Sequence, residues 1–181
     1  MPEELKIILY PDPRLRKMSK PVKEFNSELA LLAARMLELM REAKGVGLAA
    51  PQVGKNIRLF VMNATGKPED DRVIVNPALS EAEGEETAEE GCLSIPDVKI
   101  DVLRAKTLKL EAHDLSGKPI EETQSGYVAR IWQHEFDHLN GTLLTDRMGP
   151  LAKITHRRKL KELEDQWASD HPDEKEKKTR K

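Results

Sequence analysis

The chain has 181 residues with 34% charged and 38% hydrophobic side chains, and its formal net charge is −2. This length suits one domain, the charge favours neither nucleic acid nor a membrane surface, and no apolar run reaches the roughly 20 residues of a membrane span. The single cysteine, Cys92, excludes an internal disulfide framework, and the start of the chain has no pattern of a signal peptide. We therefore expect a cytoplasmic protein with neither a membrane nor a DNA partner.

The first third of the chain predicts a strand and a helix. Residues 6–10 resemble a short strand that ends at Pro11. Ser27 is a suitable N-cap for a helix over residues 28–44, and Gly45 is a suitable stop. Apolar residues at helical spacing predict its buried face: Leu29, Leu32, Met36, Leu39, Met40 and Ala43.

A narrow loop is predicted next, Gly45-Val46-Gly47-Leu48-Ala49-Ala50-Pro51-Gln52-Val53-Gly54. Its glycines and small residues let the backbone approach another group closely, and Gln52 is its one polar side chain. It lacks the Gly-Lys-Ser/Thr ending of a phosphate loop and does not match a dinucleotide-binding turn. By itself the segment is best explained as a structural turn.

The middle of the chain predicts several short strands. Residues 57–63 and 72–76 form the first pair, and 98–104 and 107–112 the second. The acidic stretch 80–90 between the pairs indicates a solvated edge or loop. Residues 116–119 make a turn. Helices on either side of these strands indicate an α+β fold, in which a central helix packs against mostly antiparallel sheets, with an N-terminal and a C-terminal helix.

The central helix is predicted over residues 127–139, with Ser125 as its cap and Gly141 as its end. It carries His134-Glu135-Phe136-Asp137-His138, an H-E-x-x-H pattern. Because residues four apart share a helix face, both imidazoles can bind one metal ion, while the glutamate beside them reaches a water. The alternative is a polar helix face with two unrelated histidines.

The C-terminal part predicts one amphipathic helix and a tail. From Lys153 onward, apolar residues at helical spacing can pack on the body of the protein: Ile154, Leu160, Leu163 and Trp167. We expect residues 1–168 to form one catalytic domain. The charged residues 169–181 would be a disordered tail.

A hydrolytic metal site needs a third protein ligand and an open position for water. Gly141 continues the pattern of one peptidase class, but Leu144 stands where that class has its third ligand. A downstream carboxylate, Glu162 or Glu164, is possible, although ion pairs within a helix explain both more simply. Cys92 is the remaining candidate, since a thiolate is a strong ligand for zinc or ferrous iron.

Three segments together resemble the signature motifs of peptide deformylases: Gly45-Val46-Gly47-Leu48-Ala49-Ala50-Pro51-Gln52, Glu90-Gly91-Cys92-Leu93-Ser94 and Gln133-His134-Glu135-Phe136-Asp137-His138. The similarity extends from Tyr10 to about Arg147. It implies removal of the formyl group from the N-terminal formyl-methionine of nascent polypeptides, with release of formate.

The resemblance implies a site with one divalent metal ion held by Cys92, His134 and His138. The metal is most often Fe²⁺ and can be replaced by Zn²⁺ or Ni²⁺. Glu135 would transfer protons, and the Gln52 amide with the backbone N–H of Leu93 would stabilise the oxyanion. We expect the substrate-binding residues to be Val46, Gly47, Glu90, Gly91, Tyr127 and Ile131; of these, Val46, Tyr127 and Ile131 would line the methionine pocket.

A deformylase acts on nascent chains, so the basic residues of the C-terminal helix could contact ribosomal RNA. These residues are Arg157, Arg158, Lys159 and Lys161. Two other functions stay open at this point. A metallopeptidase would use a carboxylate as third ligand and survive loss of Cys92, and a structural-metal or binding protein would close the fourth position and leave Glu135 without a function.

Overall fold

The computed structural model describes residues 4–173. It has three α-helices and one antiparallel sheet of five strands in the order β1-β2-β3-β4-β5, which confirms the predicted α+β fold. The helices are α1 (Ser27–Glu42), α2 (Gly126–Leu139) and α3 (Pro150–Asp170). The strands are β1 (Gly47–Ala49), β2 (Leu59–Met62), β3 (Arg72–Cys92), β4 (Ile95–His113) and β5 (Pro119–Ser125). Within the described residues, no helix is long and apolar enough to cross a membrane.

The core lies on both faces of the strands nearest α1 and α2. All four residues of β2 are buried. Because side chains alternate along a strand, Leu59 and Val61 pack in the cluster with α1, whereas Phe60 and Met62 pack in the cluster with α2. The central helix α2 is therefore covered by the sheet, and Trp132 on it is fully buried.

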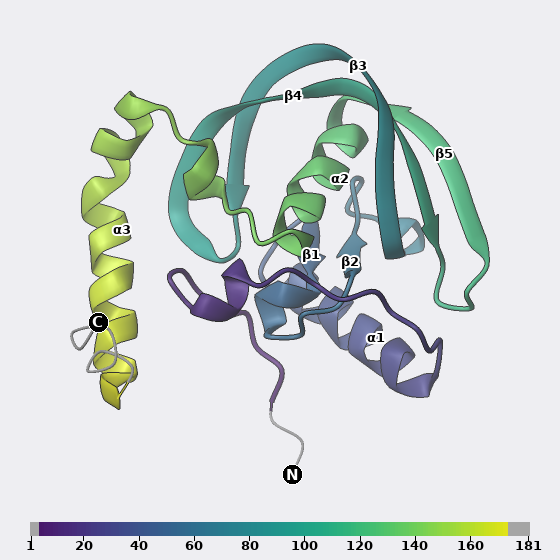
Figure 1. The fold of residues 1–181 in the computed structure, drawn as a ribbon, viewed down its shortest axis with the longest axis horizontal. Coiled ribbons are helices and arrows are strands. Elements are labelled where there is room, and N and C mark those ends of the chain that lie inside the picture. The colour runs from purple at the N-terminus through teal and green to yellow at the C-terminus, as the bar shows by residue number, and fades with distance from the viewer. Residues whose placement is uncertain (1–3, 174–181) are drawn as a thin grey trace.

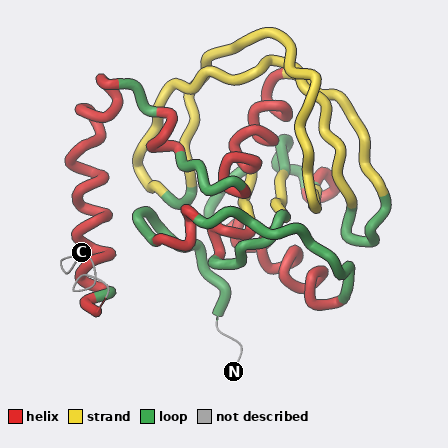
Figure 2. Tube along the Cα trace, viewed as in Figure 1, coloured by secondary structure: helices red, strands yellow, loops and turns green. Residues whose placement is uncertain are grey.

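The strands β3 and β4 form a long bent hairpin that arches over α2 (Figure 1). Figure 2 shows the hairpin as two continuous strands, which corrects two predictions. Residues 80–90 are mostly exposed, as predicted, but they are part of β3 rather than a loop. Residues 98–104 and 107–112, predicted as two strands, belong to the single strand β4. Register shifts near Asn76 and Glu81, both with positive φ, interrupt the regular pairing and allow the bend.

Two further elements differ from the prediction. Residues 6–10 form no strand, because Ile8 N–H donates to the Gln52 carbonyl and Tyr10 N–H to the Ser94 carbonyl, so alternate residues bond to different segments. Strand β5 was not expected; Ile120 is one of its few apolar residues, as suits a sheet edge.

The helix boundaries also differ from the prediction. The N-cap of α1 is Asn26, whose side chain accepts from Leu29 N–H, so Ser27 is the first helical residue. Ser125 is at the N-cap position of α2, but its side chain makes no capping bond. Helix α3 begins at Pro150, before Lys153.

Helix α3 lies outside the sheet, beside the turn between β3 and β4 (Figure 1). As predicted, Leu160 and Leu163 pack on the body of the protein, against a cluster of buried residues that comes mainly from β4 and includes Val98, Ile100 and Val102. Ile154 is 72% exposed, so its predicted packing on the body is wrong. The helix continues through Asp170, and residues 174–181 of the predicted tail lie outside the described residues.

Candidate active site

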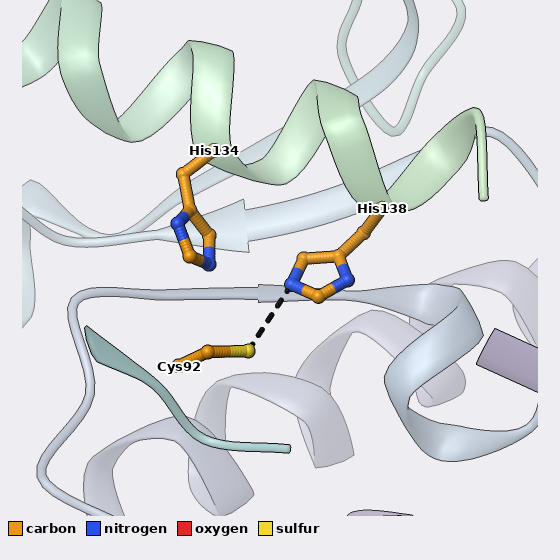
Figure 3. A group of neighbouring side chains, drawn as sticks. All are labelled: Cys92, His134 and His138. Atoms are coloured by element: carbon orange, nitrogen blue, oxygen red, sulfur yellow. Dashed lines mark hydrogen bonds between the residues drawn. The ribbon is translucent and has the colours of Figure 1, made fainter. Parts of the chain in front are cut away.

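The three candidate metal ligands meet between the hairpin turn and α2. The potential ligand atoms of Cys92, His134 and His138 all lie within 4.8 Å of one another. Figure 3 shows both imidazoles projecting from α2 towards the thiol, which approaches from the end of β3. The Cys92 Sγ is 3.4 Å from His138 Nε2. Among the described residues, no other group of His, Cys, Asp and Glu side chains has this metal-ligand arrangement.

Local structure explains this convergence. His134 and His138 are one helical turn apart, and their ring centroids are separated by 5.1 Å. Cys92 is the last residue of β3 and pairs with Ile95 across a tight turn, after a register shift that follows Gly91. The irregular end of the ladder therefore turns the thiol towards α2.

The donor set fits a tetrahedral divalent metal. Bond lengths of about 2.3 Å to sulfur and 2.1 Å to nitrogen put neighbouring ligand atoms about 3.6 Å apart, close to the observed 3.4 Å. His134 Nδ1 lies 2.9 Å from a carboxylate oxygen of Glu90. A carboxylate only accepts, so Nδ1–H donates and Nε2 keeps its lone pair for a metal.

The two histidines differ in basicity in the metal-free protein. Burial alone would lower the pKa of His134, but hydrogen bonds with Cys92 and Glu90 raise this pKa well above its usual value. Burial and the neighbouring His134 lower the pKa of His138. Metal binding would displace the proton from His134 and so depend on pH.

Glu135 has the surroundings of a proton-transfer group. Its side chain is buried, and Oε2 has no hydrogen-bond partner among the described residues. Burial, with Glu90 and Asp137 nearby, raises its pKa to about 7, near the value suited to a general base. Space for it depends on Gly47, where an added Cβ would lie 2.3 Å from Glu135 Oε1.

Gln52 is held in one orientation beside the thiol. Its Oε1 accepts from Ala49 N–H at 2.9 Å, so its Nε2 faces Ser94 Oγ at 3.1 Å and Cys92 Sγ at 3.6 Å. The predicted loop around Gln52 is in fact β1 followed by a 3₁₀ turn over Ala50–Val53. The donor end of the amide therefore points towards the candidate metal ligands.

A cavity of about 560 Å³ opens onto this site. Its lining includes every predicted substrate-binding residue: Val46, Gly47, Glu90, Gly91, Tyr127 and Ile131. Ile131 is 4% exposed and forms part of the inner wall, whereas Tyr127 is 54% exposed and lies at the mouth. Leu93 also lines the cavity, and its side chain occupies the space that a Cβ on Gly45 would need.

A buried ionic network behind the site was not predicted. The Glu90 carboxylate accepts two hydrogen bonds from Arg104, one from Arg130 at 2.8 Å and one from His134. Arg104 also donates to Asp137 at 2.7 Å. These contacts outweigh burial and lower the pKa of Glu90 to about 2. Arg104 continues the alternating buried positions of β4 after Val98, Ile100 and Val102. A charged residue in this apolar series is the sequence feature that could have revealed the network.

The other positions considered for a third metal ligand do not contribute to the group formed by Cys92, His134 and His138. Leu144 is a buried core residue. Glu162 accepts from Arg158 on the same helix, and Glu164 accepts from the Tyr10 hydroxyl at 2.6 Å. Neither carboxylate belongs to a potential metal group in the described part of the chain.

Comparisons with known proteins agree on one family. The model of the polypeptide deformylase family matches residues 4–153. A peptide deformylase of Thermotoga petrophila is 43% identical over 159 residues, which cover 87% of this chain and 95% of that protein. A crystal structure of a peptide deformylase from Legionella pneumophila is similar with a TM-score of 0.84 and 44% identity, covering 91% of this chain and 97% of the other. A Plasmodium falciparum peptide deformylase structure gives a TM-score of 0.89 at 39% identity, with 92% and 99% coverage.

Proposed function

Because the chain belongs to the peptide deformylase family, whose enzymes remove the N-terminal formyl group from nascent polypeptides, we propose which of its residues perform that hydrolysis. Cys92, His134 and His138 would hold one divalent metal ion. The observation that carries this proposal is the convergence of their ligand atoms within 4.8 Å, beside the buried Glu135, whose Oε2 lacks a partner within residues 4–173.

We propose Fe²⁺ as the working metal, with Zn²⁺ or Ni²⁺ able to replace it. A site with one thiolate and two imidazoles accepts each of these borderline metals. When bound, such a metal polarises carbonyl groups and makes water more acidic. Analysis of the metal content of protein purified without oxygen tests the identity of the ion.

Glu135 would act as general base and then general acid. Its carboxylate would take a proton from the attacking water and deliver it to the departing amine, so that formate and a free amino terminus are the products. The raised pKa of about 7 supports this function, because such a group both accepts and returns a proton near neutral pH.

Gln52 and Leu93 would stabilise the charge that develops on the formyl oxygen. The Gln52 amide is pre-oriented by Ala49 N–H and Ser94 Oγ, so it need not reorganise during the reaction. The backbone N–H of Leu93, in the turn between β3 and β4, would be the second donor. Loss of one such donor costs about 10²–10³ in turnover.

The methionine side chain would lie against Val46, Tyr127 and Ile131, with the backbone of Gly47 and Gly91 beside the substrate. All five residues line the cavity. We assign Glu90 a positioning function instead of a substrate contact, because its carboxylate is occupied by Arg104, Arg130 and His134.

Formate release from formyl-Met-Ala-Ser by anaerobically prepared, Fe²⁺-loaded protein tests the proposal. We expect Glu135→Ala to lower turnover by about 10²–10⁴, while Glu121→Ala, at an exposed position of β5, should behave as the wild type. Cys92→Ser should lose both metal and activity. Hydrolysis of unformylated peptides that survives Cys92→Ser would instead favour a metallopeptidase.

We further propose that the enzyme works in the cytoplasm and that α3 contacts ribosomal RNA. Arg157 and Arg158 on α3 are exposed. Part of the positive charge is already paired, since Arg158 contacts Glu162, Lys159 contacts Asp97 and Lys161 contacts Asp165. Ribosome cosedimentation should fall in the double variant Arg157→Glu/Arg158→Glu, and unchanged cosedimentation would refute the contact.

A further inference from the structure

The mouth of the active-site cavity carries an unbalanced positive charge. We propose that Lys44 makes the enzyme prefer substrates with an acidic side chain at one of the first two residues after the formyl-methionine. This inference rests on the proposed function and specifies the class of nascent chain that is processed fastest.

The other charges around the cavity are neutralised in pairs. Glu89 lies 3.5 Å from Lys99, and Asp97 lies 3.0 Å from Lys159 on α3. The buried Glu90 of the lining is paired with Arg130 and His134, and the buried Glu135 belongs to the proposed reaction centre rather than to the mouth. Lys44 also lines the cavity and is exposed, and it has no ion-pair partner within residues 4–173. The mouth therefore keeps one positive charge.

The backbone holds Lys44 at this position. Its φ is +56°, and its N–H donates to the Arg41 carbonyl, while Gly45 N–H donates to the Met40 carbonyl. These bonds complete the C-terminal end of α1 and satisfy carbonyls that would otherwise attract cations. The backbone of Lys44 is held by these bonds, and its exposed side chain is long enough to place the ammonium group in front of the cavity.

The path of the substrate brings later residues past this ammonium group. With the formyl group at the metal ligands and methionine against Ile131, the chain must leave through the mouth, where Val46 is 39% exposed. An extended peptide rises roughly 3.3 Å per residue, and Lys44 is two residues before Val46. One of the two residues after methionine therefore passes within reach of Lys44.

Paired peptides measure this preference. We would compare amidated formyl-Met-Asp-Ser with formyl-Met-Lys-Ser, and formyl-Met-Ala-Asp with formyl-Met-Ala-Lys, using formyl-Met-Ala-Ser as the neutral reference. At one of the two positions, kcat/KM for the acidic peptide should exceed that for the basic peptide by about two- to five-fold. The difference should lie in KM and shrink in about 0.5 M salt, because exposed charges are screened.

Three variants separate Lys44 from general charge effects. Lys44→Glu should reverse the acidic-to-basic ratio, and Lys99→Gln should reduce it by releasing Glu89 from its ion pair. Lys23→Glu makes the same change in net charge at an exposed lysine outside the cavity lining and should leave the ratio unchanged.

Equal kcat/KM values at both positions, or a preference that survives Lys44→Glu, would overturn the inference. Either outcome counts against the inference only if the protein hydrolyses the reference peptide formyl-Met-Ala-Ser. No hydrolysis of that peptide by folded, metal-loaded protein would overturn the proposed function itself.

Discussion

Replacing Glu90 with glutamine should weaken both the fold and the metal centre, because its carboxylate joins them. The group accepts four hydrogen bonds, from Arg104, Arg130 and His134. A glutamine of the same shape removes the negative charge and turns an N–H₂ towards one of these donors. Two buried guanidinium groups then lose much of their compensation, and the imidazole of His134 loses the acceptor that orients it.

Two estimates of the loss in stability agree. Removing one partner of a buried ion pair costs about 3–5 kcal/mol. Hydrogen bonds from His134 and Arg104 outweigh burial and lower the pKa of Glu90 from 4.5 to about 2, which corresponds to roughly 3 kcal/mol of stabilisation at neutral pH. We therefore expect the free energy of unfolding of metal-free Glu90→Gln to fall by about 3 kcal/mol. Metal affinity should fall by about 10- to 100-fold, as for other residues that orient a ligand.

Urea unfolding of chelator-treated protein measures the first effect, and competition with a chromophoric chelator measures the second. The matched control is Glu89→Gln, at the neighbouring residue, whose side chain is 62% exposed and pairs with Lys99. The folded-state pKa of Glu90 lies below its ordinary value, so its contribution is present above pH 4.5 and is lost as the pH falls towards about 2. The difference between the wild type and Glu90→Gln should shrink over that range.

The reasoning is refuted if Glu90→Gln is no less stable than Glu89→Gln at pH 7. Normal metal affinity in a destabilised Glu90→Gln would separately refute the orientation of His134 by Glu90.

Three other substitutions test the packing around the site. Gly47→Ala places a methyl group against Glu135 and should lower kcat by roughly 100-fold with unchanged metal content; formate release and metal analysis decide this, and normal turnover would contradict it. Trp132→Ala removes a fully buried side chain and should cost about 3–5 kcal/mol in urea unfolding; a loss under 1 kcal/mol would show that the core can collapse into the space. Tyr10→Phe deletes the hydrogen bond to Glu164 and should cost about 1 kcal/mol while accelerating hydrogen exchange in α3; unchanged exchange would mean that other contacts hold that helix.

The candidate ligands were predictable because their chemistry restricts residue type and spacing. A helix places His134 and His138 on one face, and Cys92 is the sole cysteine of the chain. The network behind them was not predicted, because Arg104 and Arg130 have no motif. Their partners, Glu90 and Asp137, come from other segments, and only the tertiary fold brings these charges together.

The local sequence pattern also did not predict the lengths of β3 and β4. Bulges near Asn76 and Glu81 break the alternation of side chains, so β3 reads as separate pieces although its pairing with β4 continues through Gly91. The outer part of the hairpin is mostly polar because solvent covers it. Residues 6–10 show the reverse error: their apolar character suits a strand, but no single partner strand lies beside them.

The segment before Pro11 has a practical consequence for preparing this enzyme. The Ile8 N–H donates to the carbonyl of Gln52, a candidate catalytic residue, and the Tyr10 N–H donates to the carbonyl of Ser94, which follows the candidate Leu93. Backbone atoms make these contacts, so most side chains are acceptable there, but proline at either position removes a donor. Removal of residues up to Tyr10 would likewise delete both donors, one to the 3₁₀ turn that holds Gln52 and one to the β3–β4 turn that holds Ser94. Affinity tags and fusion partners at the amino terminus should therefore be joined through a linker that leaves residues 4–10 free to dock.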